Sequence, residues 1–222
     1  MRVFFGTVSN DPSILKRILM FSDLNGATVY QSAKDMATEG WNELLEKAEG
    51  EADIAVLCHH DMYFPPKWLD TLKEKISELP DSWIVAGFFG INEDGDFCGK
   101  IHDRRIPLPV KTEHELPMQG IAIDGCALVF NLTKGFRYEP MPGFDLYDVY
   151  AVLRAKEMGG TAWIIDCLPE HYATRPFNWK PDALFMKNWE WLKQRFPNEH
   201  IISTCFRDKE HEYWQWLARE GI

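Results

Sequence analysis

The chain has 222 residues, of which 45% are hydrophobic and 26% charged, so it is long enough to bury one substantial core. Its formal net charge of -10 offers no broad basic surface to a phosphate backbone, and we expect no nucleic-acid partner. The five cysteines lie far apart without a Cys-x-x-Cys pair, which argues against a disulfide framework or a zinc knuckle. No apolar run approaches the roughly 20 residues of a membrane span, and the N-terminus lacks a signal-peptide pattern. We therefore expect a cytoplasmic protein without a transmembrane segment.

Short apolar runs alternate with helical patterns over the first ninety residues. Strands are expected at residues 3–8, 27–31, 53–57 and 83–89, and helices at 13–21, 41–48 and 65–79. The run at 53–57 is apolar throughout, which is typical of a strand buried on both faces. Successive strand–helix units predict an α/β fold with a mostly parallel central sheet flanked by helices.

The pattern changes after residue 90. Residues 92–96 indicate a tight turn, and the polar, proline-rich stretch 103–117 is expected to cross the surface irregularly. Further elements are a strand at 121–130, a helix at 147–158, a strand at 161–167, and two Trp-rich helices near 184–195 and 210–219. We expect residues 1–180 to form one domain and 181–222 to form a C-terminal helical extension packed on it. The tryptophans of that extension could also form an acceptor platform or join two copies of the chain.

Polar residues follow the carboxyl ends of the predicted strands, where ligands collect in parallel sheets. They are Ser9 and Asn10, Gln31 and Ser32, His59, His60 and Asp61, Asp124 and Gly125, and Glu170 and His171. The densest group is His59-His60-Asp61, which directly follows a buried strand. A carboxylate there can hold a hard divalent cation that neutralises a diphosphate, or it can simply cap the following turn.

The segment 57–69, Leu-Cys-His-His-Asp-Met-Tyr-Phe-Pro-Pro-Lys-Trp-Leu, resembles the metal-binding stretch of family 2-like glycosyltransferases with the GT-A fold. In that group a strand ends in Asp-x-Asp, followed by an aromatic residue, two prolines and Trp-Leu. Asp61 matches the second aspartate and His59 the first, where histidine lowers the negative charge. Residues 164–172 resemble the strand and histidine that supply a second metal ligand. The resemblance thus implies the GT-A fold and a Mn²⁺ or Mg²⁺ ion held by Asp61, His171 and His59.

Three other segments extend the resemblance over most of the chain. Residues 37–48 resemble a stretch that shapes the donor pocket, although Asn42 could serve only as a helix-start residue. Residues 123–129 resemble the strand beside the reacting sugar, where glycine lets backbone approach a ligand or merely forms a bulge. At the start of the helix near 147, Asp148 matches the catalytic base and Asp145 is the rival. The implied nucleotide-sugar site comprises Ser9, Asn10, Gln31, Asn42, His60, Asp124 and Gly125.

The implied function is metal-dependent transfer of a sugar, with inversion, from a nucleotide-diphosphate donor to a hydroxyl of a glycan or other acceptor. The family suggests a UDP-sugar as the donor. A non-catalytic nucleotide-sugar or glycan binder on the same fold is the alternative, because histidine stands where the family has an aspartate. A nucleotidyltransferase is less favoured, because residues 6–11 contain no basic side chain for a triphosphate.

Overall fold

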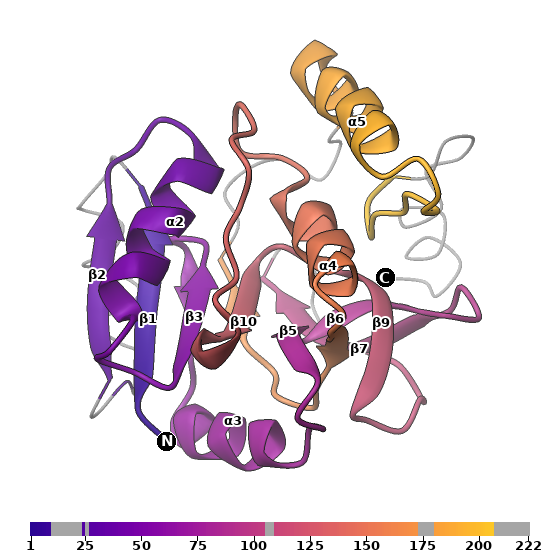
Figure 1. The fold of residues 1–222 in the computed structure, drawn as a ribbon. Helices are drawn as coiled ribbons and strands as arrows, with labels where there is room; N and C mark the ends of the chain where they lie inside the picture. Colours follow the sequence, from indigo (N-terminus) through magenta and orange to yellow (C-terminus); the bar gives the residue numbers. More distant parts are fainter. Residues whose placement is uncertain (10–23, 25–26, 105–108, 173–179, 207–222) are drawn as a thin grey trace.

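A computed structural model describes the chain except for residues 10–23, 25–26, 105–108, 173–179 and 207–222 (Figure 1). Its strands are β1 (Val3–Val8), β2 (Thr28–Ser32), β3 (Ile54–Cys58), β4 (Met62–Tyr63), β5 (Trp83–Gly87), β6 (Phe89–Asn92), β7 (Phe97–Asp103), β8 (Val110–Lys111), β9 (Met118–Ile123), β10 (Ala127–Asn131), β11 (Thr161–Ile164) and β12 (Glu170–His171). Its helices are α2 (Ala37–Ala48), α3 (Trp68–Ser77), α4 (Tyr147–Glu157) and α5 (Ala183–Arg195), with a short 3-10 helix η2 (Leu132–Lys134). The helices expected at 13–21 and 210–219 lie outside the described residues.

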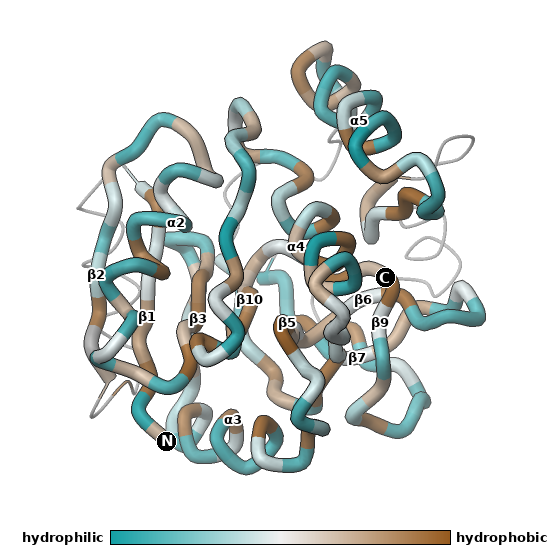
Figure 2. The backbone as a smooth tube through the Cα atoms, viewed as in Figure 1, coloured by the Kyte–Doolittle hydropathy of each residue, from teal (hydrophilic) through white to brown (hydrophobic). Residues whose placement is uncertain are grey.

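The central strands β1 and β3 are buried along their whole length, as the apolar runs predict. Successive side chains of a strand point to opposite faces of the sheet. Phe4 and Leu57 accordingly belong to one core together with residues of α2, α4 and α5. Phe5 and Val56 belong to a second core with residues of α3. Both faces of the sheet are therefore covered, and Figure 2 shows hydrophobic stretches along β1, β3 and β5.

The sheet is mixed, and the expectation of a mostly parallel sheet is wrong. The strand order is β2-β1-β3-β10-β5-β11-β9-β6-β7-β12-β4, with β8 paired to β7. Among the described strands, parallel pairing is confined to β1 with β2, β1 with β3, β5 with β11, and β7 with β12. The other pairs are antiparallel, including β10 with both of its neighbours. The strand–helix units that favour parallel pairing end after β5, and β6 and β7 are then joined by a turn too short for a parallel crossover.

Two irregular regions differ from the sequence expectation. Residues 121–130 form parts of two strands, β9 and β10, because the chain turns at 124–126, where the carboxylate of Asp124 accepts a hydrogen bond from the Cys126 amide at 3.0 Å. The stretch expected to be irregular contains β8, which forms a hairpin with the unexpected strand β7. β7 has only three apolar side chains, Phe97, Cys98 and Ile101, and two of them are consecutive, so the sequence shows no clear period of two over the strand.

A three-residue connection shows that the sheet must curl. Residues 59–61 join β3, the third strand of the order, to β4 at its far end. In a flat sheet these strands would lie eight spacings apart, or about 38 Å at ~4.8 Å per spacing. The four backbone steps from Cys58, the last residue of β3, to Met62, the first residue of β4, span only about 14 Å when fully extended. The sheet therefore bends until β4 and its neighbour β12 lie beside the carboxyl end of β3.

Helix α5 packs on the rest of the molecule through its inner face. Trp189 is fully buried, and the Asn188 side chain donates a hydrogen bond to the Pro142 carbonyl at 2.8 Å. Arg195, in the last turn, pairs with Glu139 at 2.8 Å. Trp189 thus belongs to the core of its own chain, whereas Trp214 and Trp216 of the expected extension, and Trp179 just before it, lie outside the described residues.

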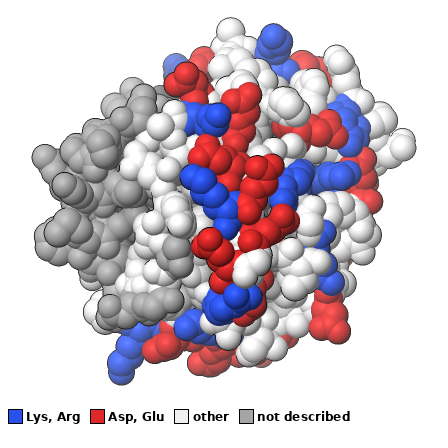
Figure 3. Space-filling view, turned by 60° about the vertical axis from the view of Figure 1, so that its left-hand side comes forward, with Lys and Arg blue, Asp and Glu red and all other residues white. Residues whose placement is uncertain are grey.

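Charges on the described surface are mixed. On the face drawn in Figure 3, acidic and basic side chains are interspersed. Glu43 pairs with Lys47 at 3.0 Å along α2, and Glu49 pairs with Arg137 at 2.7 Å. No helix in the described part of the chain combines the length and apolar character needed to cross a membrane. All five cysteines are free.

Candidate metal centre

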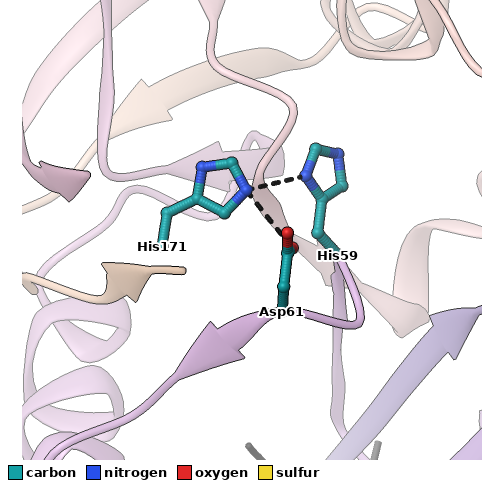
Figure 4. A group of neighbouring side chains, drawn as sticks. All are labelled: His59, Asp61 and His171. Atoms are coloured by element: carbon teal, nitrogen blue, oxygen red, sulfur yellow. Dashed lines mark hydrogen bonds and ion pairs between the residues drawn. The ribbon is translucent and has the colours of Figure 1, made fainter. Parts of the chain in front are cut away.

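The side chains of His59, Asp61 and His171 converge at the carboxyl end of β3 (Figure 4). Nε2 of His171 lies 3.2 Å from Oδ1 of Asp61 and 3.4 Å from Nδ1 of His59. The antiparallel ladder between β12 and β4 causes this meeting, because it pairs His171 with Met62, the residue after Asp61. The backbone amide of Tyr172 extends the ladder by donating to the Asp61 carbonyl at 2.8 Å. Residues 110 positions apart are thereby fixed by backbone pairing.

The chemistry of these side chains fits a divalent ion. One carboxylate oxygen and two imidazole nitrogens lie within 4.8 Å of one another. Ligands about 2.1 Å from a common ion at tetrahedral or octahedral angles lie roughly 3.0–3.4 Å apart, as the two measured separations do. Oδ1 of Asp61 is buried and faces the ring nitrogen of His171 at 3.2 Å as an ion pair, without a hydrogen bond from any other described residue. A buried carboxylate oxygen needs a positive charge beside it, which a cationic His171 supplies in the metal-free protein and a bound metal ion would supply in its place.

The electrostatics of the centre are dominated by His171. Burial alone would lower the pKa of His171, but the carboxylates of Asp103 and Asp61 outweigh burial and raise it to about 9. Burial alone would raise the pKa of Asp61, but the His171 imidazole outweighs burial and lowers it to about 2. Burial, together with the positive charge of His171, lowers the pKa of His59 to about 4. At neutral pH the metal-free centre thus holds a cationic His171, an ionised Asp61 and a neutral His59.

Two residues missed in the sequence contact the outer sides of the imidazoles. Nε2 of His59 lies 2.6 Å from the hydroxyl of Tyr147, which donates to the Gly125 carbonyl at 2.7 Å. Nδ1 of His171 lies 3.5 Å from Oδ2 of Asp103, its register partner on β7. Asp103 ends a strand, which is the signal that singled out other site residues, but β7 itself was not recognised. Tyr147 carries no such signal apart from its place beside Asp148.

The candidate base Asp148 occupies the same corner of the molecule. It lies in the first turn of α4, directly after Tyr147, and is buried. Burial and the charge of Asp124 raise the pKa of Asp148 to about 7. A Cβ atom at Gly125 would lie 3.2 Å from Cβ of Asp148 and 2.9 Å from the Tyr147 hydroxyl. The missing side chain at Gly125 therefore lets the turn after β9 lie against the start of α4.

Asp124 and Asp145 also lie near Asp148. The second carboxylate oxygen of Asp124 accepts a hydrogen bond from the Thr204 hydroxyl at 3.3 Å. Asp145 precedes α4 and contributes, after Asp124, to the raised pKa of Asp148. The sequence indicated no role for Thr204, because no motif near it predicts that this part of the chain lies beside the turn after β9.

The residues expected to bind the nucleotide sugar lie in different parts of the described structure. Ser9 follows β1 and Gln31 lies in β2, and the Gln31 amide donates a hydrogen bond to the Ser9 carbonyl. Both polar atoms of the Asn42 side chain bond to the backbone of Tyr138 at 2.9 Å, so Asn42 fastens α2 to that segment. His60 is partly buried beside Asp61, and Asn10 lies outside the described residues.

Comparisons with known proteins identify the fold. No family model and no curated protein matches the chain. The structure of GalNAc-T7 with UDP, GalNAc and Mn²⁺ superposes with a TM-score of 0.60 at 12% identity, covering 99% of this chain and 50% of that one. S. aureus TarS 1-349 with UDP-GlcNAc gives 0.58 at 10% identity, covering 99% and 71%. The mannosyltransferase PcManGT from Pyrobaculum calidifontis with GDP-Man and Mn²⁺ gives 0.52 at 12% identity, covering 80% and 58%.

These likenesses define the class to which the fold belongs. The chain has the GT-A fold of glycosyltransferases, as its resemblance in sequence implied. It spans half the length of the GalNAc-T7 chain.

Proposed function

We propose that the protein is a metal-dependent glycosyltransferase that moves a sugar from a nucleotide-diphosphate donor to an acceptor hydroxyl. The observation that carries this proposal is the contact of His171 with Asp61 and His59 at 3.2 and 3.4 Å, at the carboxyl end of a buried strand. The GT-A fold supports it, because the similar structures hold nucleotides or nucleotide sugars, two of them with Mn²⁺.

In this proposal His59, Asp61 and His171 hold a Mn²⁺ or Mg²⁺ ion. When bound, such an ion supplies the positive charge that stabilises a departing nucleotide diphosphate. Ser9 and Gln31, linked by a hydrogen bond after β1 and in β2, border the nucleotide together with the sequence neighbour Asn10. The neighbours of the metal ligands, His60, Asp124 and Gly125, border the sugar and diphosphate.

Asp148 is the proposed base. Its side chain takes the proton of the acceptor hydroxyl as the hydroxyl oxygen attacks the anomeric carbon, and the diphosphate leaves from the opposite face with inversion. Its raised pKa of about 7 supports this role, since a base is most effective with a pKa near the working pH. Asp145 is the second candidate, because it lies just outside the same helix start.

The proposed centre is expected to prefer Mn²⁺ to Mg²⁺. Two of its three ligands are imidazoles, which suit transition metals better than Mg²⁺, an ion that favours oxygen ligands. We expect Mn²⁺ to bind at least about tenfold more tightly than Mg²⁺. Titration of Mn²⁺ by its electron paramagnetic resonance signal, with Mg²⁺ as competitor, measures the ratio. Equal affinities would contradict the assignment of both histidines as ligands.

A thermal-shift screen tests the proposed function. UDP, GDP and their sugars are each added with and without Mn²⁺, since a ligand that binds only the folded state raises the melting temperature. At least one nucleotide sugar is expected to raise it, by about 2.7 kcal/mol of stability at a hundredfold excess over Kd, and only with Mn²⁺. Stabilisation by none of them would contradict the proposal. Donor binding without donor hydrolysis or transfer would identify a non-catalytic binder.

A further inference from the structure

His59 and His171 each have an outward ring nitrogen with a protein partner. On His59, Nδ1 faces His171 and Nε2 lies 2.6 Å from the Tyr147 hydroxyl. On His171, Nε2 faces Asp61 and Nδ1 lies 3.5 Å from a carboxylate oxygen of Asp103. The inward nitrogens, Nδ1 of His59 and Nε2 of His171, lie 3.4 Å apart beside Asp61 and are the ones that could bind an ion (Figure 4).

The hydrogen bonds of Tyr147 determine where the ring proton of His59 lies. A phenol has one proton, and Tyr147 donates it to the Gly125 carbonyl at 2.7 Å, because a carbonyl can only accept. The phenol oxygen must therefore accept from His59, so Nε2 of His59 carries a proton. A neutral imidazole has one ring proton, so Nδ1 of His59 is left with a lone pair directed at the centre.

Asp103 acts in the same way on His171. A carboxylate can only accept, so it favours a proton on Nδ1 of His171; when the cationic ring loses one proton as an ion binds, Nδ1 keeps its proton and Nε2 becomes the ligand. The parallel pairing of β12 with β7 places the two residues in register. Each proposed imidazole ligand thus has one residue that orients its ring and selects its tautomer.

We propose that Tyr147 is a positioning residue that holds His59 as the Nε2–H tautomer and thereby makes Nδ1 of His59 the third metal ligand. This inference rests on the proposed metal centre. It explains how a histidine can serve where the sequence pattern has an aspartate, since an imidazole binds metal only in one tautomer. Tyr147 also precedes Asp148 at the start of α4, so one residue connects the metal ligand with the proposed base.

Tyr147→Phe tests the inference, with Tyr150→Phe as its matched control. Both changes remove a phenol oxygen from α4 and keep the ring, and the Tyr150 oxygen accepts a hydrogen bond at 3.2 Å from the amide of Glu139, a residue that is not part of the metal centre. We expect Tyr147→Phe to weaken Mn²⁺ binding about 10–100-fold, the usual effect of losing a residue that orients a ligand. Tyr150→Phe is expected to bind Mn²⁺ as the wild type does. Isothermal titration calorimetry measures both affinities.

A second measurement needs no variant. In ¹⁵N-histidine-labelled, metal-free wild type, the ring nitrogens of His59 are expected to show a protonated Nε2 and an unprotonated Nδ1. A protonated Nδ1, or wild-type Mn²⁺ affinity in Tyr147→Phe, would overturn the inference. If instead the wild type binds no Mn²⁺ while His59 is the Nε2–H tautomer, the proposed metal centre fails and the tautomer assignment stands.

Discussion

Replacing Asp61 with asparagine is expected to abolish Mn²⁺ binding and to reduce sugar transfer to background. Asp61 is the only carboxylate among the three converging residues, and its buried Oδ1 faces His171 at 3.2 Å. The amide is neutral, so the ion would lose its one anionic ligand. We expect the Mn²⁺ affinity to fall by more than about a hundredfold, since changes that only orient a ligand already cost ~10–100-fold. Calorimetry measures the binding, and an assay of donor turnover measures the activity.

Asp53→Asn is the matched control for this change. Asp53 lies just before the opposite end of the same strand, β3, and pairs with Arg2 on the surface at 3.0 Å. The substitution alters the net charge by the same amount without touching the centre. Wild-type binding and turnover are expected for it. Full Mn²⁺ affinity in Asp61→Asn would contradict the assignment of Asp61.

Replacing Asp148 with asparagine is expected to lower kcat/KM for transfer about 100–10,000-fold, the range that a positioned general base contributes. Binding of Mn²⁺ and donor should be unchanged, because Asp148 is not among the three converging ligands. Asp145→Asn is the control and is expected to change kcat/KM by less than about threefold. If Asp145→Asn is inactive and Asp148→Asn is active, the base is Asp145.

Activity and stability should depend on the ionisation of Asp148 in opposite directions. The base must be ionised, so kcat/KM is expected to fall about tenfold per pH unit below about pH 7. Its folded pKa lies above the ordinary value of 3.8, so between about pH 4 and 7 the unfolded chain loses this proton while the folded protein keeps it. The contribution of Asp148 to the free energy of unfolding should therefore fall as pH rises through this window, by up to about 1.4 kcal/mol per unit, and level off above pH 7. Urea unfolding of wild type and Asp148→Asn at several pH values measures the difference, and identical slopes would contradict the raised pKa.

The sequence predicted the local elements that position the site. The apolar runs at 3–8 and 53–57 correspond to β1 and β3, and the polar residues at 59–61 do follow the buried strand. These features are readable because burial on both faces requires a continuous apolar run, and because polar groups beside a core are costly without a partner.

The pairing of the strands could not be predicted from the sequence in the same way. The turn at 124–126 divides one expected strand into two, and β12 is a two-residue strand whose partners are β7 and β4. A short strand has too few residues for a period, and its partners lie far away in the sequence. The meeting of Asp61 with His171 was expected from the resemblance to a family and from the place of polar residues after strands, but not from any recognised pairing of β12 with β4. Asp103 ends a strand that the sequence pattern did not indicate, and Tyr147 gave no signal because its role arises from neighbours that only the folded chain brings close.

Anomalous diffraction at the Mn²⁺ absorption edge, on crystals grown with Mn²⁺ and a nucleoside diphosphate, would locate the ion itself. We expect a peak bonded to Asp61 Oδ1, His171 Nε2 and His59 Nδ1, with the diphosphate on its open side. A peak elsewhere in the molecule, or no peak while His171 still contacts Asp61, would contradict the proposed metal centre.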